Sequence, residues 1–227
     1  YIGPLTSGYL GRLGKAVEEM GSPNPMQITQ CGGGTISLER GRTAPLLTLD
    51  SGPVSGVTGS RYLGDLMELP NIITTDMGGT SFDVGIIHEG HPAFSYVSNV
   101  NQYEYFLPKV DIQAIGNGGG SLVRADERTR TLHVGPESAG ADPGPVCYGR
   151  GGLVPTVTDA ALVLGYIGTS SFADGRVNLD QQAAEAAITE IGRKVDLDML
   201  DSASGIVTIA EHQMANLIRR MTIQKGH

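Results

Sequence analysis

The segment Thr75–Gly85 reads TDMGGTSFDVG, and it restricts the possible folds of this chain more than any other part. A short apolar run ends at Asp76, a Gly-Gly-Thr turn follows, and a second apolar run begins at Asp83. Glycines in such a turn allow backbone N–H groups to point into the bend, where they form a concavity that binds anions. The pattern therefore predicts a hairpin whose tip binds a phosphate group.

The residues of this tip have separate candidate roles. We expect backbone N–H groups and hydroxyl groups to bind the phosphate, and the residues that supply them are Gly78, Gly79, Thr80 and Ser81. Asp76 and Asp83 are the candidate catalytic residues, and Asp76 at the strand end is placed to hold Mg²⁺ through water or to orient an attacking water. A lone Gly-Gly-Thr is more often an ordinary turn, but the longer DxGGTxxD pattern favours phosphate binding.

Glycine is unusually frequent and clustered, with 33 glycines among 227 residues, about twice the usual ~7%. One cluster, Gly118, Gly119 and Gly120 followed by Ser121, comes directly after a predicted strand. It is a candidate to cradle a second phosphate or to let a substrate lie against bare backbone. A glycine-rich bulge without a ligand is an equally good interpretation of this cluster.

The net charge excludes several classes of function. The chain carries 16 Lys and Arg residues against 24 Asp and Glu residues, a formal net charge of −8. An acidic protein has no long-range attraction for nucleic acids or anionic lipids, and no apolar run approaches the roughly 18 residues of a membrane span. The two cysteines, without a signal peptide, indicate cytosolic thiols and a cytoplasmic protein. The chain begins at Tyr1 rather than Met, which suggests a piece of a longer polypeptide.

Hydrophobic periodicity predicts helices and strands that alternate along the chain. The expected helices are residues 5–20, 51–69 (with Ser51 as its N-cap), 158–165, 180–193 and 198–221. The expected strands are 26–30, 45–49, 71–76, 83–87, 93–97, 109–115, 121–125 and 131–134, of which 71–76, 83–87 and 93–97 form an antiparallel meander. A long irregular loop is expected over residues 135–155. This order favours a layered α/β or α+β domain.

Several motifs in order carry a family resemblance. DMGGTSFDVGII resembles the second phosphate-binding hairpin of the superfamily of ATPases that includes actin, Hsp70 and sugar kinases. Five further segments resemble one branch of it, the hydantoinase A/5-oxoprolinase family, which includes N-methylhydantoinase and ketone carboxylase subunits: LDSGPVSGVTG (49–59), IGNGGGSL (115–122), VGPESAGA (134–141), PGPVCYGRGG (143–152) and PTVTDA (155–160).

The resemblance implies a fold and a place in a longer protein. The implied fold is an α/β, actin-like (ribonuclease-H-like) ATPase lobe with an antiparallel meander, parallel strands and packed helices. Residues 1–227 would be the central hydantoinase/oxoprolinase domain, about a third of a subunit, with a leading part (1–50), a nucleotide-lobe core (51–170) and a helical part (171–227). Family members also carry an N-terminal segment with a first phosphate loop.

The resemblance also implies a function. The implied enzyme uses ATP and Mg²⁺ to open a cyclic amide, of the hydantoin or 5-oxoproline type, through a phosphorylated intermediate, and the isolated piece would be inactive. A hydantoinase-B-type partner subunit or fused domain is implied as well. One alternative is a subunit of an ATP-dependent ketone carboxylase. An alternative of another class is an actin-like or Hsp70-like nucleotide-binding module without amidohydrolase activity.

A metal site is a further candidate that follows from the resemblance. Relatives usually have Asp-x-His before the glycine cluster, so Asp111, Cys147 and Asp159 are candidate ligands of Zn²⁺. This chain has Gln113 at the position of the histidine, and an amide is a poor zinc ligand, so a buried structural thiol at Cys147 is the alternative. The pair His88 and His91 is predicted to be exposed at a turn rather than bound to a metal.

Overall fold

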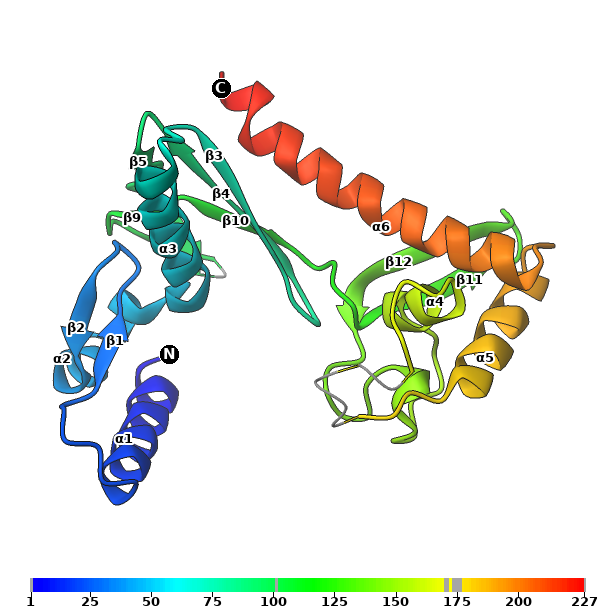
Figure 1. Ribbon diagram of the computed structural model, residues 1–227, viewed down its shortest axis with the longest axis horizontal. Helices are drawn as coiled ribbons and strands as arrows, with labels where there is room; N and C mark the ends of the chain where they lie inside the picture. The colour runs from blue at the N-terminus through cyan, green and yellow to red at the C-terminus, as the bar shows by residue number, and fades with distance from the viewer. Residues whose placement is uncertain (1, 101, 170–171, 173–176, 227) are drawn as a thin grey trace. The chain divides into compact units, whose positions relative to one another are not determined.

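The computed structural model describes residues 2–100, 102–169, 172 and 177–226 (Figure 1). The chain folds into two compact units, and neither is one continuous segment. Unit 1 contains the residues up to Asp76 together with Val84–Gln113, and unit 2 contains Met77–Asp83 together with Ala114–Gly226. These units divide the chain differently from the predicted segments 1–50, 51–170 and 171–227.

The elements follow one another as the mixed pattern predicted. The helices are α1 (Gly3–Glu19), α2 (Leu38–Thr43), α3 (Ser51–Met67), α4 (Val157–Val163), α5 (Gln181–Arg193) and α6 (Met199–Met221). The strands are β1 (Gln27–Thr29), β2 (Thr35–Ser37), β3 (Ile72–Met77), β4 (Phe82–His88), β5 (His91–Pro92), β6 (Phe94–Ser95), β7 (Ser98–Val100), β8 (Tyr103–Tyr105), β9 (Lys109–Val110), β10 (Ile112–Ile115), β11 (Ser121–Asp126) and β12 (Thr131–Ser138).

The main sheet has the strand order β10-β4-β3, with β5 paired to β4. The predicted meander is correct as far as Ala93, whose N–H donates to the Ile86 carbonyl at 2.9 Å. Beyond Ala93 it is wrong, because β6 pairs antiparallel with β9 instead. The buried side chains Val54, Val57, Ile87 and Val110 form one core cluster of unit 1.

Two predictions for the first 70 residues are also wrong. Pro45–Thr48 forms a 3₁₀ turn rather than a strand, and the Leu47 N–H donates to the Ala44 carbonyl at 3.0 Å. The apolar run Pro45–Leu49 has the composition of a strand, but its proline suits the first turn of a helix equally well. Helix α3 is preceded by Asp50 as its N-cap residue rather than Ser51, and the Asp50 carboxylate pairs with Lys109 Nζ at 2.6 Å instead of capping.

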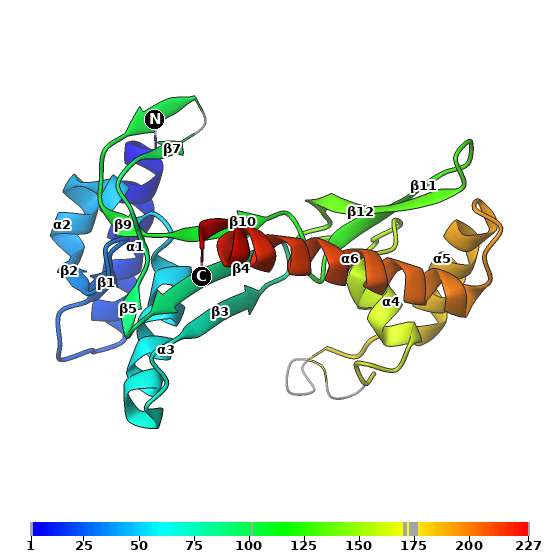
Figure 2. The ribbon, with the colours of Figure 1, turned by 90° about the horizontal axis from the view of Figure 1, so that it is seen from above.

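Unit 2 is built on the antiparallel hairpin of β11 and β12, against which α4, α5 and α6 pack (Figure 2). Strand β12 runs to Ser138 and so takes the first residues of the predicted loop 135–155. One core cluster consists of small and branched apolar side chains: Val123, Val134, Val157, Ala160, Ile188, Ile191, Ala203, Ile206 and Ala210. Asp180 and Asp198 accept hydrogen bonds from the first turns of α5 and α6, so both predicted helix starts are confirmed.

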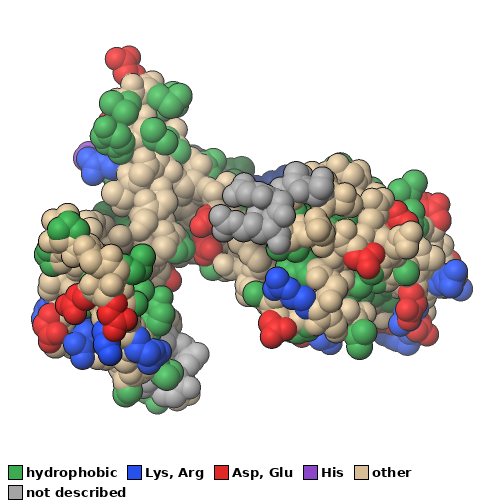
Figure 3. All heavy atoms as spheres, turned by 60° about the horizontal axis from the view of Figure 1, so that its bottom comes forward, with side chains coloured by type: hydrophobic (Ala, Val, Ile, Leu, Met, Phe, Trp, Pro, Cys, Tyr) green, Lys and Arg blue, Asp and Glu red, His purple; other side chains and the backbone are tan. Residues whose placement is uncertain are grey.

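In the view of Figure 3, the Lys and Arg side chains of the described residues are interspersed with Asp and Glu side chains. Among the described residues, no helix is both long enough and apolar enough to span a membrane. Cys31 and Cys147 are both buried free thiols.

Candidate functional site

The tip of the β3–β4 hairpin presents backbone N–H groups outward. The Gly78 N–H donates to the Ser81 carbonyl at 3.0 Å and closes the turn. The next three N–H groups, of Gly79, Thr80 and Ser81, donate to no protein atom within the described residues. A Cβ built on Gly79 would have no described heavy atom within 4 Å, so the space beside this residue is open. Consecutive unpaired N–H groups next to open space are suited to bind an anion.

The two hydroxyl groups of the tip have other partners. The Ser81 hydroxyl donates to Asp83 Oδ2 at 3.0 Å, and Thr80 Oγ1 lies 3.3 Å from the Ser138 hydroxyl. The expectation that both hydroxyl groups donate to a phosphate is therefore not supported, because Ser81 uses its proton on Asp83. Asp83 therefore stabilises the turn by accepting the Ser81 hydroxyl hydrogen bond. Its catalytic role stays a prediction.

The glycine cluster after β10, Gly118–Ser121, holds the hairpin tip through backbone hydrogen bonds. The Gly119 N–H donates to the Gly78 carbonyl at 3.0 Å, and the Gly120 N–H donates to the Gly79 carbonyl at 2.7 Å. The other two N–H groups of the cluster bond within it, from Gly118 to Ser121 Oγ and from Ser121 to the Gly118 carbonyl. All four N–H groups are thus occupied, so this cluster supports the tip and has none left for a second phosphate.

Close approach explains why this cluster is made of glycine. A Cβ on Gly118 would lie 2.6 Å from the Gly78 carbonyl oxygen, and a Cβ on Gly120 would lie 2.8 Å from the Gly79 carbonyl oxygen. Carbon atoms do not approach oxygen this closely, so any side chain here would push the cluster away from the tip.

The start of α4 holds the glycine cluster in place. Both the N–H and the hydroxyl group of Thr158 donate to the Gly119 carbonyl, each at 2.8 Å. Thr156 and Asp159 form a capping box at the same helix start, in which each side chain bonds the other residue's N–H. Hydrogen bonds therefore connect the helix start to Gly119, and Gly119 to the hairpin tip.

Asp159 is a buried carboxylate that stabilises the local fold through hydrogen bonds. It is fully buried and accepts hydrogen bonds from four groups: the Val146, Cys147 and Thr156 N–H groups and the Thr156 hydroxyl. Burial raises the pKa of the Cys147 thiol far above its ordinary value, and the Asp159 carboxylate raises it further. The Asp159 carboxylate thus has four hydrogen-bond donors within the fold, and the role of Cys147 and Asp159 as zinc ligands stays a prediction.

The third predicted zinc ligand lies in the other unit. Asp111 belongs to unit 1, whereas Cys147 and Asp159 belong to unit 2. In the part of the chain that the structure describes, no three His, Cys, Asp or Glu residues are grouped so as to hold a metal ion. The zinc site stays a prediction, and no chemistry is derived from it. His88 and His91 pair across β4 and β5 and are exposed, as predicted.

A cavity of about 530 Å³ lies beside the tip, within unit 2. Its walls come from the hairpin tip, the glycine cluster, the segment around Tyr148 and the start of α4. The lining residues are Met77, Gly78, Gly79, Gly119, Gly120, Gly140, Pro145, Tyr148, Val157, Thr158, Ala161, Ile167 and Phe172. Asp76 is exposed at the end of β3, next to Met77 in the chain.

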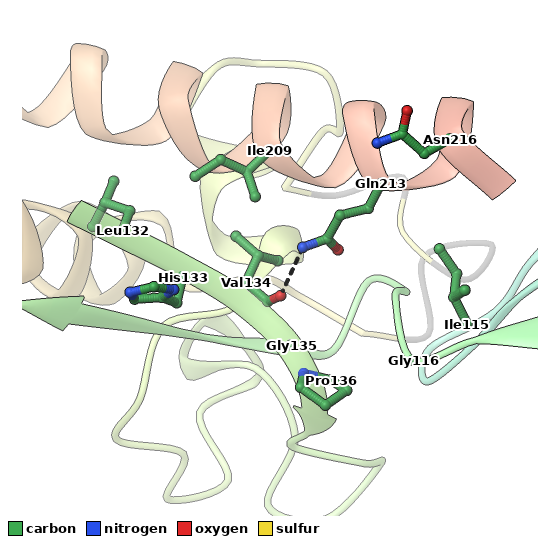
Figure 4. A pocket seen from close by; sticks show the side chains of 10 residues that line it. All are labelled: Ile115, Gly116, Leu132, His133, Val134, Gly135, Pro136, Ile209, Gln213 and Asn216. Carbon is green, nitrogen blue, oxygen red and sulfur yellow. Dashed lines mark hydrogen bonds between the residues drawn. The ribbon is translucent and has the colours of Figure 1, made fainter.

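A second cavity, of about 570 Å³, lies between α6 and β12 (Figure 4). Gln213 reaches from α6 to β12, where its Nε2 donates to the Val134 carbonyl at 3.1 Å. The buried amide of Asn117 donates to Gln213 Oε1 at 3.0 Å and to the Ala210 carbonyl at 2.8 Å. Asn117 thereby fixes the start of the glycine cluster to α6, and its Oδ1 atom has no partner among the described residues.

Comparison with known proteins identifies the family. The family model described as "Hydantoinase/oxoprolinase" matches residues 1–227, the whole chain. The chain belongs to the hydantoinase/oxoprolinase family. The resemblance seen in the sequence motifs is therefore confirmed.

Two members of the hydantoinase/oxoprolinase family illustrate the match. Caprolactamase subunit alpha of Pseudomonas jessenii is 37% identical over 228 residues, which cover 100% of this chain and 33% of that protein. The crystal structure of the ATP-dependent caprolactamase from that organism has a TM-score of 0.79 at 36% identity and covers 100% of this chain and 33% of that one.

The second member is the acetone carboxylase beta subunit of Xanthobacter autotrophicus, 34% identical over 220 residues, or 96% of this chain and 30% of that protein. A nucleotide-free structure of acetone carboxylase, an enzyme of ATP-dependent acetone carboxylation, has a TM-score of 0.90 at 32% identity. That match covers 98% of this chain and 31% of the other. The chain thus spans about a third of the length of these hydantoinase/oxoprolinase relatives, and its fold is their actin-like ATPase fold.

Three residues in the motifs of this hydantoinase/oxoprolinase chain have hydrogen-bonding roles that were not predicted from the sequence: Asn117, Thr158 and Asp159. Thr158 and Asp159 lie in the PTVTDA segment, where the spacing from Thr156 to Asp159 is the signature of a capping box and could have identified Asp159 as structural. Asn117 has no such local signature, because its partners Ala210 and Gln213 are more than 90 residues away.

Proposed function

We propose that this chain supplies the phosphate-binding part of an ATP-dependent enzyme that opens a cyclic amide. The observation that carries the proposal is a row of three N–H groups, of Gly79, Thr80 and Ser81, at an exposed turn, for which the described residues supply no acceptor. The ATP dependence of the caprolactamase and of the acetone carboxylase supports a nucleotide phosphate as the anion. Mg²⁺ would arrive with the nucleotide, with Asp76 as its candidate contact.

The proposed reaction activates an amide, whose carbonyl carbon is a poor electrophile. The carbonyl oxygen attacks the γ-phosphorus of ATP, and ADP leaves. Water then adds to the carbonyl carbon, the ring C–N bond breaks with a proton going to the amine, and a second water hydrolyses the acyl phosphate to acid and phosphate. Phosphoryl transfer depends mainly on positioning and on charge stabilisation, which the N–H groups of Gly79–Ser81 are suited to supply.

Carboxylation of a ketone is the second candidate. The higher identity to the caprolactamase, 37% against 34%, favours amide hydrolysis. The higher TM-score to the acetone carboxylase, 0.90 against 0.79, favours carboxylation. Both relatives are named as subunits, so we also propose a partner subunit, of the hydantoinase-B type, for the complete enzyme.

Phosphate release by the full-length protein with its partner subunit tests the proposal. Release that requires a cyclic amide is the expected result, whereas release that requires acetone with bicarbonate would establish the carboxylase. Substrate-independent ATP hydrolysis would overturn both and indicate a nucleotide-binding module.

The variant Asp76→Ala provides an internal check of the proposed site. Its side chain is exposed, so the fold should persist while turnover falls by about a hundredfold or more, the usual effect of losing a group that orients water or a metal. A normally folded variant that loses less than about tenfold in steady-state turnover would remove Asp76 from the proposed mechanism.

A further inference from the structure

The end of β12 contacts the hairpin tip through the side chain of Ser138. Ser138 Oγ lies 3.3 Å from Thr80 Oγ1 and donates to the Gly79 carbonyl at 3.4 Å. The Gly140 N–H donates to the same Ser138 oxygen at 3.1 Å. All four residues belong to unit 2. Because Gly79 and Thr80 carry two of the N–H groups proposed to bind phosphate, Ser138 touches the proposed site from a second element.

Backbone hydrogen bonds hold Ser138 in this place. The Ala139 N–H donates to the Gly120 carbonyl at 2.8 Å, and the Gly120 N–H donates to the Gly79 carbonyl at 2.7 Å. The residue after Ser138 and the hairpin tip are thus bonded to the same glycine. A Cβ built on Gly120 would lie 3.0 Å from Ser138 Oγ, so this glycine also leaves the room that the Ser138 hydroxyl occupies.

The Ser138 hydroxyl has one proton and two acceptors within reach. In one arrangement it donates to the Gly79 carbonyl while Thr80 donates to Ser138 Oγ, and in the other it donates to Thr80 Oγ1. A hydroxyl hydrogen rotates about its C–O bond to suit its acceptors. The exchange costs little, because the Gly79 carbonyl keeps the shorter bond from the Gly120 N–H in both arrangements.

A phosphate at the turn favours the second arrangement. Thr80 is exposed, and its own N–H is the middle one of the three proposed to bind the phosphate. A hydroxyl group donates a shorter and stronger hydrogen bond to a charged phosphate than to a neutral hydroxyl. Because Thr80 has a single hydroxyl proton, that proton leaves Ser138 when it turns to the phosphate. Ser138 can then donate to Thr80 Oγ1, and successive hydrogen bonds in such a chain strengthen one another.

We propose that Ser138 is a positioning residue for the phosphate bound at this turn. Hydrogen bonds would then run from the Gly140 N–H to Ser138 Oγ, from the Ser138 hydroxyl to Thr80 Oγ1, and from the Thr80 hydroxyl to the phosphate. Each proton stays on its own oxygen, so two hydroxyl groups rotate and no covalent bond breaks. The inference rests on the proposed function and adds a residue of β12 to the same site.

Calorimetric titration of the full-length protein with a non-hydrolysable ATP analogue provides the first test. Thr80→Val should weaken binding about tenfold, the usual effect of losing a hydrogen bond to a charged group, and Thr80→Ser should restore it. Ser138→Ala should weaken binding about fivefold through the loss of its bond to Thr80, and Ser138→Thr, which keeps the hydroxyl, should restore it. Thr131→Val is the matched control, because it removes a hydroxyl from the Thr129–Thr131 pair at the other end of β12 and should leave the affinity unchanged.

A double substitution separates this role from a purely structural one. If Ser138 acts through Thr80, adding Ser138→Ala to Thr80→Val should weaken binding by less than about twofold further. Steady-state kinetics of the complete enzyme should show the same pattern in KM for ATP, with a smaller change in kcat. Ser138→Cys, whose thiol is a weak donor, provides a second measurement if Ser138→Ala does not fold, and it should also weaken binding.

Three results would overturn the inference. An affinity that Ser138→Ala leaves unchanged or raises would show that Ser138 does not assist Thr80. Losses that multiply in the double variant would show that the two side chains act independently. Unchanged binding in Thr80→Val would show that its hydroxyl donates nothing to the phosphate. The proposed function survives each of these results as long as Gly79→Val weakens nucleotide binding, whereas unchanged affinity in Gly79→Val would contradict the phosphate-binding turn itself.

Discussion

At the scale of single residues, two glycines of the site have opposite functions. The missing side chain of Gly79 leaves open space beside the unpaired N–H groups, whereas the missing side chain of Gly118 lets two backbone segments approach closely. We expect the missing side chain of Gly79 to leave room for a ligand, whereas the missing side chain of Gly118 is required by the fold. Substitutions at the two positions should therefore produce different defects.

Gly79→Val should weaken nucleotide binding by about tenfold or more without lowering the melting temperature, because its side chain would occupy only the open space beside the turn. Gly118→Ala should lower the melting temperature, because its Cβ would meet the Gly78 carbonyl.

Calorimetry with a non-hydrolysable ATP analogue measures the effect on nucleotide binding, and thermal denaturation of the full-length protein measures the effect on stability. Gly3→Val, also in open space but in α1, is the matched control. Unchanged affinity in Gly79→Val would mean that the turn has only a structural role.

Cys147 should be chemically inert in the folded protein. Because burial raises the pKa of this thiol, the folded state keeps its proton at a pH where the unfolded chain has lost it. The free energy of unfolding should therefore be insensitive to this group below about pH 8.5 and should fall as the pH rises above that value. Iodoacetamide at pH 8 should label Cys147 only after unfolding, and Cys147→Ala should reduce the loss of stability at high pH. Rapid labelling of the native protein would contradict this account.

At the scale of elements, the start of α4 positions the hairpin tip through Gly119. Thr158→Val keeps the N–H bond to Gly119 but loses the hydroxyl bond, which should cost about 1 kcal/mol of stability. If this bond also positions the tip, KM for ATP should rise severalfold with a smaller change in kcat. Thr158→Ser, which keeps the hydroxyl, should restore both values. A Thr158→Val enzyme that is less stable but has an unchanged KM for ATP would limit Thr158 to a structural role.

The elements also show which parts of the site are readable from sequence. The turn from Gly78 to Ser81 was predictable because its geometry depends on four consecutive residues. The role of Gly118–Ser121 was not, because two of its N–H groups find acceptors about 40 residues earlier in the chain. Asp159 resembled a metal ligand in the motif, and its four hydrogen-bond donors became visible only with the neighbouring segment at Val146 and Cys147. The cavity has walls from Met77 to Phe172, and no local pattern encodes it.

At the scale of the whole molecule, the proposed phosphate donors among the described residues come from the turn Gly79–Ser81. A site with phosphate contacts from one side keeps some of its hydrogen bonds but leaves much of the nucleotide in water. Because a dissociation constant of 1 mM already requires a binding free energy of about −4 kcal/mol, few contacts do not give tighter binding. We expect the 227-residue chain alone to bind ATP no better than about millimolar and to show no hydrolysis, while still unfolding cooperatively. Fluorescence anisotropy with a labelled ATP analogue checks this, and micromolar binding would show that these residues suffice.

Because the chain passes from one unit to the other and back, the hairpin tip and the glycine cluster are hard to transfer together into another protein. The segment Met77–Asp83 belongs to unit 2, but the strands that carry it lie mainly in unit 1. A shortened gene encoding residues 114–226 would retain α4, α5 and α6, yet Gly119 and Gly120 would lose their carbonyl acceptors. The proposed phosphate-binding turn and the backbone groups that support it therefore cannot be transferred to another protein as one continuous segment. Recombination between relatives that keeps the site intact has to exchange the hairpin and the glycine cluster together.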